Sequence, residues 1–222
     1  MLKNKISIII LLFIMFWSCT TSVSSMEFRT AKTAARSEKR LDRAEEWALK
    51  ALTNEVHMND PLVPYFLATE IYKPQKNWQK MAEMMFEAMK RNSEQNLEKP
   101  IPMKDGTIAR TISSGFDVYK PMIWSGLFNE ATDLYNKSIN AKNEEKSRLQ
   151  DDAIKIYETA IKVEPERSET YIVLAKFHNE IEKINKAKEF IELGLKIQSL
   201  SKQQKTELYL IYAEIYKKEK NI

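Results

Sequence analysis

The chain has 222 residues with 35 basic and 31 acidic side chains, one cysteine and four glycines. A single cysteine excludes an internal disulfide and a thiolate metal site, and the few glycines form neither the dinucleotide-binding nor the P-loop pattern. Without residues 1–18 the balance becomes 33 basic against 31 acidic residues. So neutral a chain gives no electrostatic support to nucleic-acid binding.

The N-terminal segment has the features of a secretory signal. Lys3 and Lys5 precede an unbroken apolar stretch over residues 8–17, which small polar residues follow. This order of a basic end, a short apolar core and small residues is typical of a cleaved signal. The apolar stretch is too short to cross a bilayer, which takes about 20 residues. We therefore predict that residues 1–18 are a signal peptide.

Cys19 stands where bacterial lipoprotein signals are cut, and the segment before it resembles a lipobox. Phe16 and Trp17 depart from that pattern, which usually has an aliphatic and a small residue there. The resemblance implies that Cys19 is acylated and that residues 19–24 form a tether. Two or three acyl chains would anchor the protein stably, because each buried methylene contributes about 0.8 kcal/mol. The alternative is an ordinary exported protein that is cut further on, for example after Ser24, and loses Cys19.

The same resemblance implies a location in the bacterial cell envelope, with the protein lipid-anchored and facing the periplasm. Thr20 follows the cysteine, and in lipoproteins of this kind a non-acidic residue there usually permits transfer to the outer membrane. The outer membrane is therefore the expected location rather than the inner one.

Apolar residues at helical spacing predict two helix pairs after the tether. In the first pair, over residues 25–58, alanines recur at intervals of three and four on both expected helices. A second pair is expected over 62–95. Small residues at such positions let helices approach closely. The residues that mark the first pair are Phe28, Ala31, Ala35, Ala44, Ala48 and Ala51.

Residues 96–121 interrupt the helical pattern with three prolines and two glycines. Asp105 and Gly106 lie between short runs that contain apolar residues, which indicates a short β-hairpin. We expect an irregular insertion here that is either the functional variable of the fold or a connector. A second interruption is expected over residues 140–150, which are polar.

Near the C-terminus, a pattern of small and apolar residues recurs after 34 positions. Ala153, Tyr157, Ala160 and Pro165 correspond to Ala187, Ile191, Gly194 and Ser199. A repeat of this length resembles the tetratricopeptide repeat (TPR) family. The resemblance implies an all-α solenoid of antiparallel helix pairs, with N-terminal pairs over 25–95, C-terminal repeats over 122–201 and a capping helix over 202–222.

The TPR resemblance also implies a partner groove on the concave face of each first helix. The positions that match are mixed in charge and do not form the lysine and asparagine clamp that holds a terminal carboxylate in some TPR proteins. They either line a groove for a protein or peptide or form an ordinary solvated face. These candidates are Arg29, Thr33, Arg36, Phe66, Glu70, Lys73, Ile172, Lys176, Asn179 and Glu180.

The chain offers little for catalysis. His57 and His178 are the only histidines, His57 in an expected surface turn and His178 at a core position of the last repeat. No nucleophile elbow occurs. We therefore expect no enzyme, cofactor or metal.

Two functions remain. The first is a non-catalytic, membrane-tethered scaffold for protein–protein interaction, for example an assembly factor. The alternative is a periplasmic binding module for a small molecule or glycan that stacks on Phe116, Tyr119 and Trp124.

Overall fold

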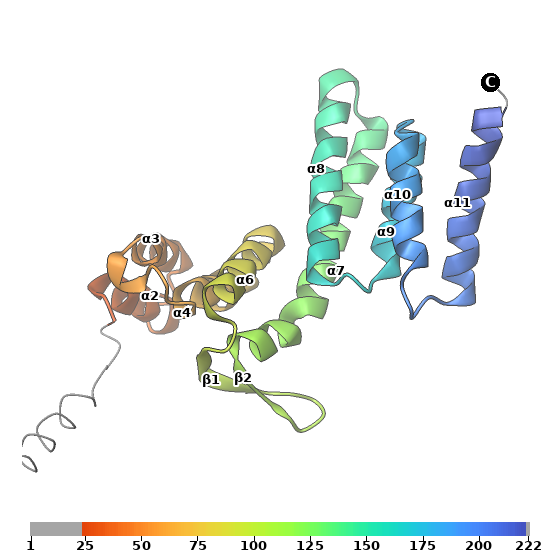
Figure 1. Ribbon diagram of the computed structural model, residues 1–222. Helices are drawn as coiled ribbons and strands as arrows, with labels where there is room; N and C mark the ends of the chain where they lie inside the picture. The colour runs from red at the N-terminus through yellow and green to blue at the C-terminus, as the bar shows by residue number, and fades with distance from the viewer. Residues whose placement is uncertain (1–23, 221–222) are drawn as a thin grey trace, which may run out of the picture.

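The structure is a computed structural model that describes residues 24–220, so the signal peptide, Cys19 and nearly all of the expected tether lie outside it. The described chain is an all-α, TPR-like solenoid of antiparallel helix pairs with one small hairpin of strands (Figure 1). This confirms the expected fold class. The elements are α2 (Met26–Arg36), α3 (Leu41–Leu52), the 3-10 turn η1 (Glu55–His57), α4 (Leu62–Phe66), the π-helical segment η2 (Leu67–Tyr72), α5 (Lys73–Gln75), α6 (Trp78–Asn92), β1 (Asn96–Pro102), β2 (Ile108–Thr111), α7 (Ile112–Asn140), α8 (Asn143–Val163), α9 (Ser168–Glu180), α10 (Ile184–Leu195) and α11 (Lys202–Lys220).

The first helix pair, α2 and α3, packs through buried alanines. Ala31, Ala34, Ala44 and Ala48 are fully buried, so the two helices meet with small side chains between them. Ser25 starts α2 because its hydroxyl accepts a hydrogen bond from the Phe28 N–H (3.2 Å).

The second pair consists of a continuous helix over α4, η2 and α5, followed by α6. The π-helical segment widens the middle of the first helix, a feature that is frequent at functional sites. Lys76 ends this helix in the left-handed conformation, and Asn77 caps α6 through the Lys80 N–H (3.2 Å). Met81 and Met85 of α6 are fully buried, so they pack the core.

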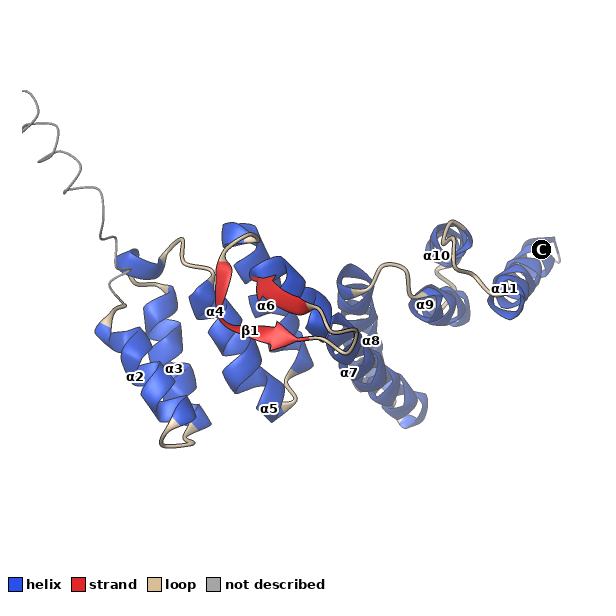
Figure 2. Ribbon diagram, turned by 90° about the horizontal axis from the view of Figure 1, so that it is seen from below, coloured by secondary structure: helices blue, strands red, loops and turns tan. Residues whose placement is uncertain are grey.

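The expected hairpin is present as β1 and β2, which pair antiparallel with Gly106 in the turn at a φ of +85°. Asn96 pairs with Thr111 and Ile101 pairs with Ala109, so residues 97–100 have no partner within this ladder and form a bulge. Figure 2 shows the strands alongside α4 and α6, and Leu97 packs against Ala88 of α6.

Helix α7 departs from two expectations about the middle of the chain. It begins at Ile112, inside the span expected to be an irregular insertion, because Thr111 and Ser114 form a capping box. It continues through Pro121, which cannot donate a helical hydrogen bond, and the ribbon changes direction along its length (Figure 1).

The polar segment over 140–150 is mostly helix and not an insertion, which corrects the expectation. Only Ala141 and Lys142 separate α7 from α8. Most of residues 144–150 are good helix formers. Glu144 and Glu145 lie in the first turn, where the helix dipole stabilises carboxylates. Residues 143–148 are polar because this end of the α7–α8 pair is exposed to solvent. Leu149 is the first residue of α8 that is buried.

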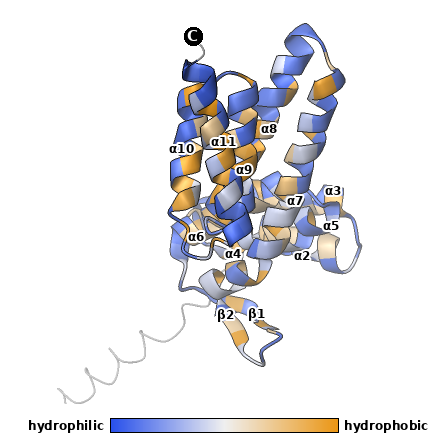
Figure 3. Cartoon of the chain, turned by 90° about the vertical axis from the view of Figure 1, so that its right-hand side faces the viewer, coloured by the Kyte–Doolittle hydropathy of each residue, from blue (hydrophilic) through white to orange (hydrophobic). Residues whose placement is uncertain are grey.

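The C-terminal helices α7 to α11 stand in a row (Figure 1). Leu174, Ala187 and Ile191 are fully buried between α9 and α10, and Figure 3 shows hydrophobic segments along these helices. Leu208 and Ile215 of α11 are also fully buried, whereas its other side carries exposed tyrosines and lysines. The last helix therefore covers the apolar end of the solenoid.

Candidate functional site

A groove of about 270 Å³ lies between the first two helix pairs and the hairpin. One wall comes from α2 and the α4–α5 helix, the opposite wall from the bulged strand β1, and Tyr119 of α7 completes the lining. The apolar part of the lining includes Phe28, Tyr65, Phe66, Leu97, Ile101 and Tyr119. The charged side chains are Arg36, Glu70, Lys73, Glu98 and Lys99.

Ion pairs join the two walls of the groove. Arg36 of α2 lies 3.3 Å from Glu70 of η2 and 3.4 Å from Glu98 of β1. Lys32 of α2 also forms an ion pair with Glu98. Burial alone would raise the pKa of Glu98, but the hydrogen bond from Lys32 and the charges of Lys32 and Arg36 outweigh it and hold that pKa below its ordinary value. Glu98 is therefore ionised at neutral pH and holds the strand against α2.

Two lysines of the lining have a different environment. The Lys73 ammonium lies 5.0 Å from the centre of the Tyr119 ring, a cation–π contact that leaves its charge without an acid. Within residues 24–220, neither Lys73 nor Lys99 has a carboxylate oxygen within 4.0 Å. The groove thus has uncompensated positive charge beside its apolar surface.

Two polar atoms of the lining residues are buried without a hydrogen-bond partner in the described part of the chain. They are the Tyr65 hydroxyl and Nε of Arg36. Burial raises the pKa of Tyr65, so its hydroxyl keeps its proton. An unsatisfied buried polar group costs about 1–3 kcal/mol.

Four of the ten predicted groove residues line this groove: Arg36, Phe66, Glu70 and Lys73. Arg29 and Thr33 lie on the exposed side of α2 and are absent from the lining. The hydroxyl of Thr33 donates to the Arg29 carbonyl (3.1 Å). The helical wall therefore follows the predicted positions in part.

The four predicted residues of α9 lie outside this groove. Lys176 pairs with Glu207, the Asn179 amide accepts from Lys218 (3.0 Å), and Glu180 accepts from the Tyr135 hydroxyl. These three line a second hollow, of about 370 Å³, beside α11, where their polar groups pair with other side chains of the chain. Ile172 is buried and lies outside the groove of the first repeats, because α9 is enclosed by α8, α10 and α11.

The structure does not form the aromatic platform of the alternative hypothesis. Phe116 is buried edge-to-face against Phe86, with ring centres 5.6 Å apart. Trp124 donates its indole N–H to the Thr170 hydroxyl (3.0 Å). Of the three expected residues only Tyr119 lines the groove.

The sequence does not predict that the hairpin forms a wall of the groove. It predicts an insertion here, but no local signal places Glu98 against α2 or Lys99 in the groove, because both positions depend on the bulge and on a contact 62 positions away.

His57 is buried and not on the surface, which corrects its assignment. It is 4% exposed, accepts the Ser25 N–H at Nε2 (3.0 Å) and contacts Asp60 through Nδ1 (2.9 Å). His178 is buried as expected and stacks on Phe190, with ring centres 5.3 Å apart. Among residues 24–220 there is no cluster of three histidine, cysteine or acidic side chains that could hold a metal ion. None of the helices in the same range is both long and apolar enough to span a membrane.

Solved structures of TPR proteins are similar to the chain at low identity. One is the crystal structure of YrrB, a TPR protein with an unusual peptide-binding site, at 14% identity and a TM-score of 0.29, covering 81% of this chain and 88% of YrrB. Two others are monomeric mutants of IFIT1, one with m7Gppp-AAAA and one with Gppp-AAAA, at 15% and 14% identity and TM-scores of 0.30. They cover 87% and 90% of this chain, which spans only 41% and 43% of IFIT1.

No family model and no curated protein sequence matches the chain. TM-scores near 0.3 carry no conclusion about function, so the function proposed below depends on the geometry of the chain itself.

Proposed function

We propose that the protein is a non-catalytic scaffold that binds another protein or a peptide in the groove between its first repeats and its hairpin. The observation that carries this proposal is the convergence of four predicted partner-facing residues with the wall of β1 and with Tyr119. An apolar surface bordered by charged side chains is the usual composition of a protein recognition site.

The shape of the groove suits a peptide segment. Its walls are helices on one side and an extended strand on the other, which suits a segment that places one or two side chains between them.

We further propose that the scaffold is tethered at Cys19 in a bacterial cell envelope, facing the periplasm and in the outer membrane rather than the inner one. The support is the resemblance of residues 1–19 to a lipoprotein signal. Metabolic labelling with a fatty acid tests this part. The native chain should incorporate the label and Cys19→Ala should not, whereas equal labelling of both, or of neither, would contradict the anchor.

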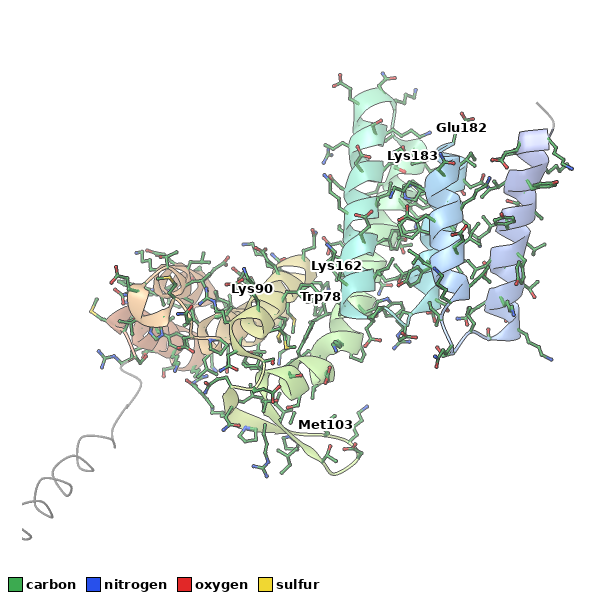
Figure 4. All side chains as sticks on the ribbon, viewed as in Figure 1. Trp78, Lys90, Met103, Lys162, Glu182 and Lys183 are labelled. Atoms are coloured by element: carbon green, nitrogen blue, oxygen red, sulfur yellow. The ribbon has the colours of Figure 1, made fainter. Side chains whose placement is uncertain are left out.

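Crosslinking in intact cells tests the scaffold function. A photoreactive amino acid is placed at Thr69, which lines the groove, and in a matched strain at Lys162, an exposed residue of α8 outside it. Figure 4 labels Lys162 on the C-terminal part of the chain. We expect one reproducible crosslinked protein from position 69 that is absent from position 162. No reproducible product from position 69 would contradict the proposal.

A further inference from the structure

The groove also indicates which kind of peptide it binds, an inference that rests on the proposed function. We propose that the occupant is an extended acidic peptide segment that places an apolar side chain between Phe66 and Ile101 and its carboxylates near Lys73 and Lys99. All four residues line the groove, two from the helical wall and two from the hairpin.

The first argument is the charge that the groove leaves uncompensated. Its lining holds three cations and two carboxylates. The two carboxylates, Glu70 and Glu98, are both engaged by Arg36, whereas Lys73 and Lys99 have no acid within ion-pair distance among the described residues. Charge complementarity therefore selects a partner with negative side chains.

The second argument is that the chain itself places a strand with an acidic side chain on this face. The bulge of β1 runs past α2 and places Glu98 on Lys32 and Arg36, while Leu97 is buried beside it. An extended segment with a buried leucine next to an ion-paired glutamate thus already packs here. The groove next to it offers the same combination of cations and apolar surface to a second strand.

The third argument is the apolar lining, which explains why a purely acidic segment would not suffice. Phe28, Tyr65, Phe66, Leu97, Ile101 and Tyr119 line the groove together with the cations. Burying one apolar side chain of the peptide among them provides attraction that salt does not screen, whereas the lysine contacts weaken with salt. Binding should therefore decrease with ionic strength and still persist at high salt.

Selection from a peptide library tests the proposal. The full-length chain, purified in detergent, is presented with immobilised 12-residue peptides of random sequence. We expect the retained peptides to be enriched in aspartate and glutamate and to contain an apolar residue beside them. The best of them, labelled with fluorescein, is then titrated by fluorescence polarisation against the parent chain, Lys73→Gln/Lys99→Gln and the control Lys162→Gln.

The double variant should weaken binding by about tenfold, while the Lys162 control leaves it unchanged, because each charge-assisted contact contributes modestly at a solvated site. Circular dichroism confirms that each variant is folded. Retained peptides of neutral or basic composition, or an affinity that the double variant leaves intact, would overturn this inference.

The two proposals fail separately. A crosslinked partner at Thr69 together with neutral peptides in the library would leave the scaffold function standing and reject the acidic ligand. A library that retains no peptide at all also rejects the acidic ligand, and the crosslinking result then decides the scaffold function by itself.

Discussion

Arg36 on α2 and Glu98 on β1 form an ion pair of 3.4 Å across 62 positions of sequence, and this pair joins the hairpin to the first repeat. The contact turns an insertion between repeats into one wall of a groove.

Glu98→Gln should weaken the attachment of the hairpin. Both side chains of the pair are about a third exposed, so solvent screens it, and we expect a loss of only about 0.5 kcal/mol in the free energy of unfolding at pH 7. Because the folded pKa of Glu98 is lowered, its contribution is complete above the ordinary value of 4.5 and disappears as the pH falls through the folded pKa.

Urea unfolding of the parent and the Glu98 variant at several pH values measures this. The difference between them should shrink as the solution becomes acidic. Glu83→Gln, at an exposed position in the middle of α6 without an ion pair among the described residues, is the control and should behave as the parent. A difference that persists unchanged at pH 3 would contradict the ionic attachment.

His178 is expected to make the protein less stable in mild acid. Desolvation, and then the nearby charges of Lys183 and Lys186, lower its pKa below 6.5 although Glu189 opposes them, and neither ring nitrogen has a partner in the described chain. Between the folded pKa and 6.5 the unfolded chain therefore binds the proton more readily. The contribution of neutral His178 to stability is therefore complete above pH 6.5 and is lost as the pH falls from 6.5 through the folded pKa.

His178→Phe keeps the stack on Phe190 and removes the unpaired nitrogens. It should raise the free energy of unfolding by about 1 kcal/mol at pH 7 and flatten the change between pH 7.5 and pH 5.5. Thermal melts followed by circular dichroism at both pH values provide the test. A variant with the same pH dependence as the parent would show that His178 does not cause it.

Gly126→Ala should destabilise the contact between α6 and α7. A Cβ at Gly126 would lie 2.4 Å from three ring atoms of Trp78, which Figure 4 shows near this junction. Alanine gains about 1 kcal/mol of helix propensity over glycine, but overpacking against a rigid indole costs about 1–3 kcal/mol and should dominate.

The melting temperature of Gly126→Ala, measured beside the exposed neighbour Ser125→Ala, provides the check. The glycine variant should melt lower and the serine variant should not. Combining Gly126→Ala with Trp78→Ala should cost less than the sum of the two single changes, because the indole that clashes is gone. Additive losses would mean that the two residues do not meet.

The sequence predicts much of the fold and only part of the site. Alanines at helical spacing and the 34-residue recurrence predict the helix pairs, and Asp105 with Gly106 predicts the hairpin, because these signals are local. The polar composition of residues 140–150 led to the wrong prediction of an insertion, because a solvent-exposed helix is polar as well. The environments of Glu98, Ile172 and His57 depend on distant elements, so no local pattern reveals them.

The central claim is that helices and hairpin form one binding groove. Hydrogen–deuterium exchange of the full-length chain, alone and with the partner captured at Thr69, tests it most directly. The account predicts that residues 67–72 of η2 and 96–102 of β1 become protected together, with α9 to α11 unchanged. Protection confined to α9 to α11, with no change in η2 and β1, would contradict it.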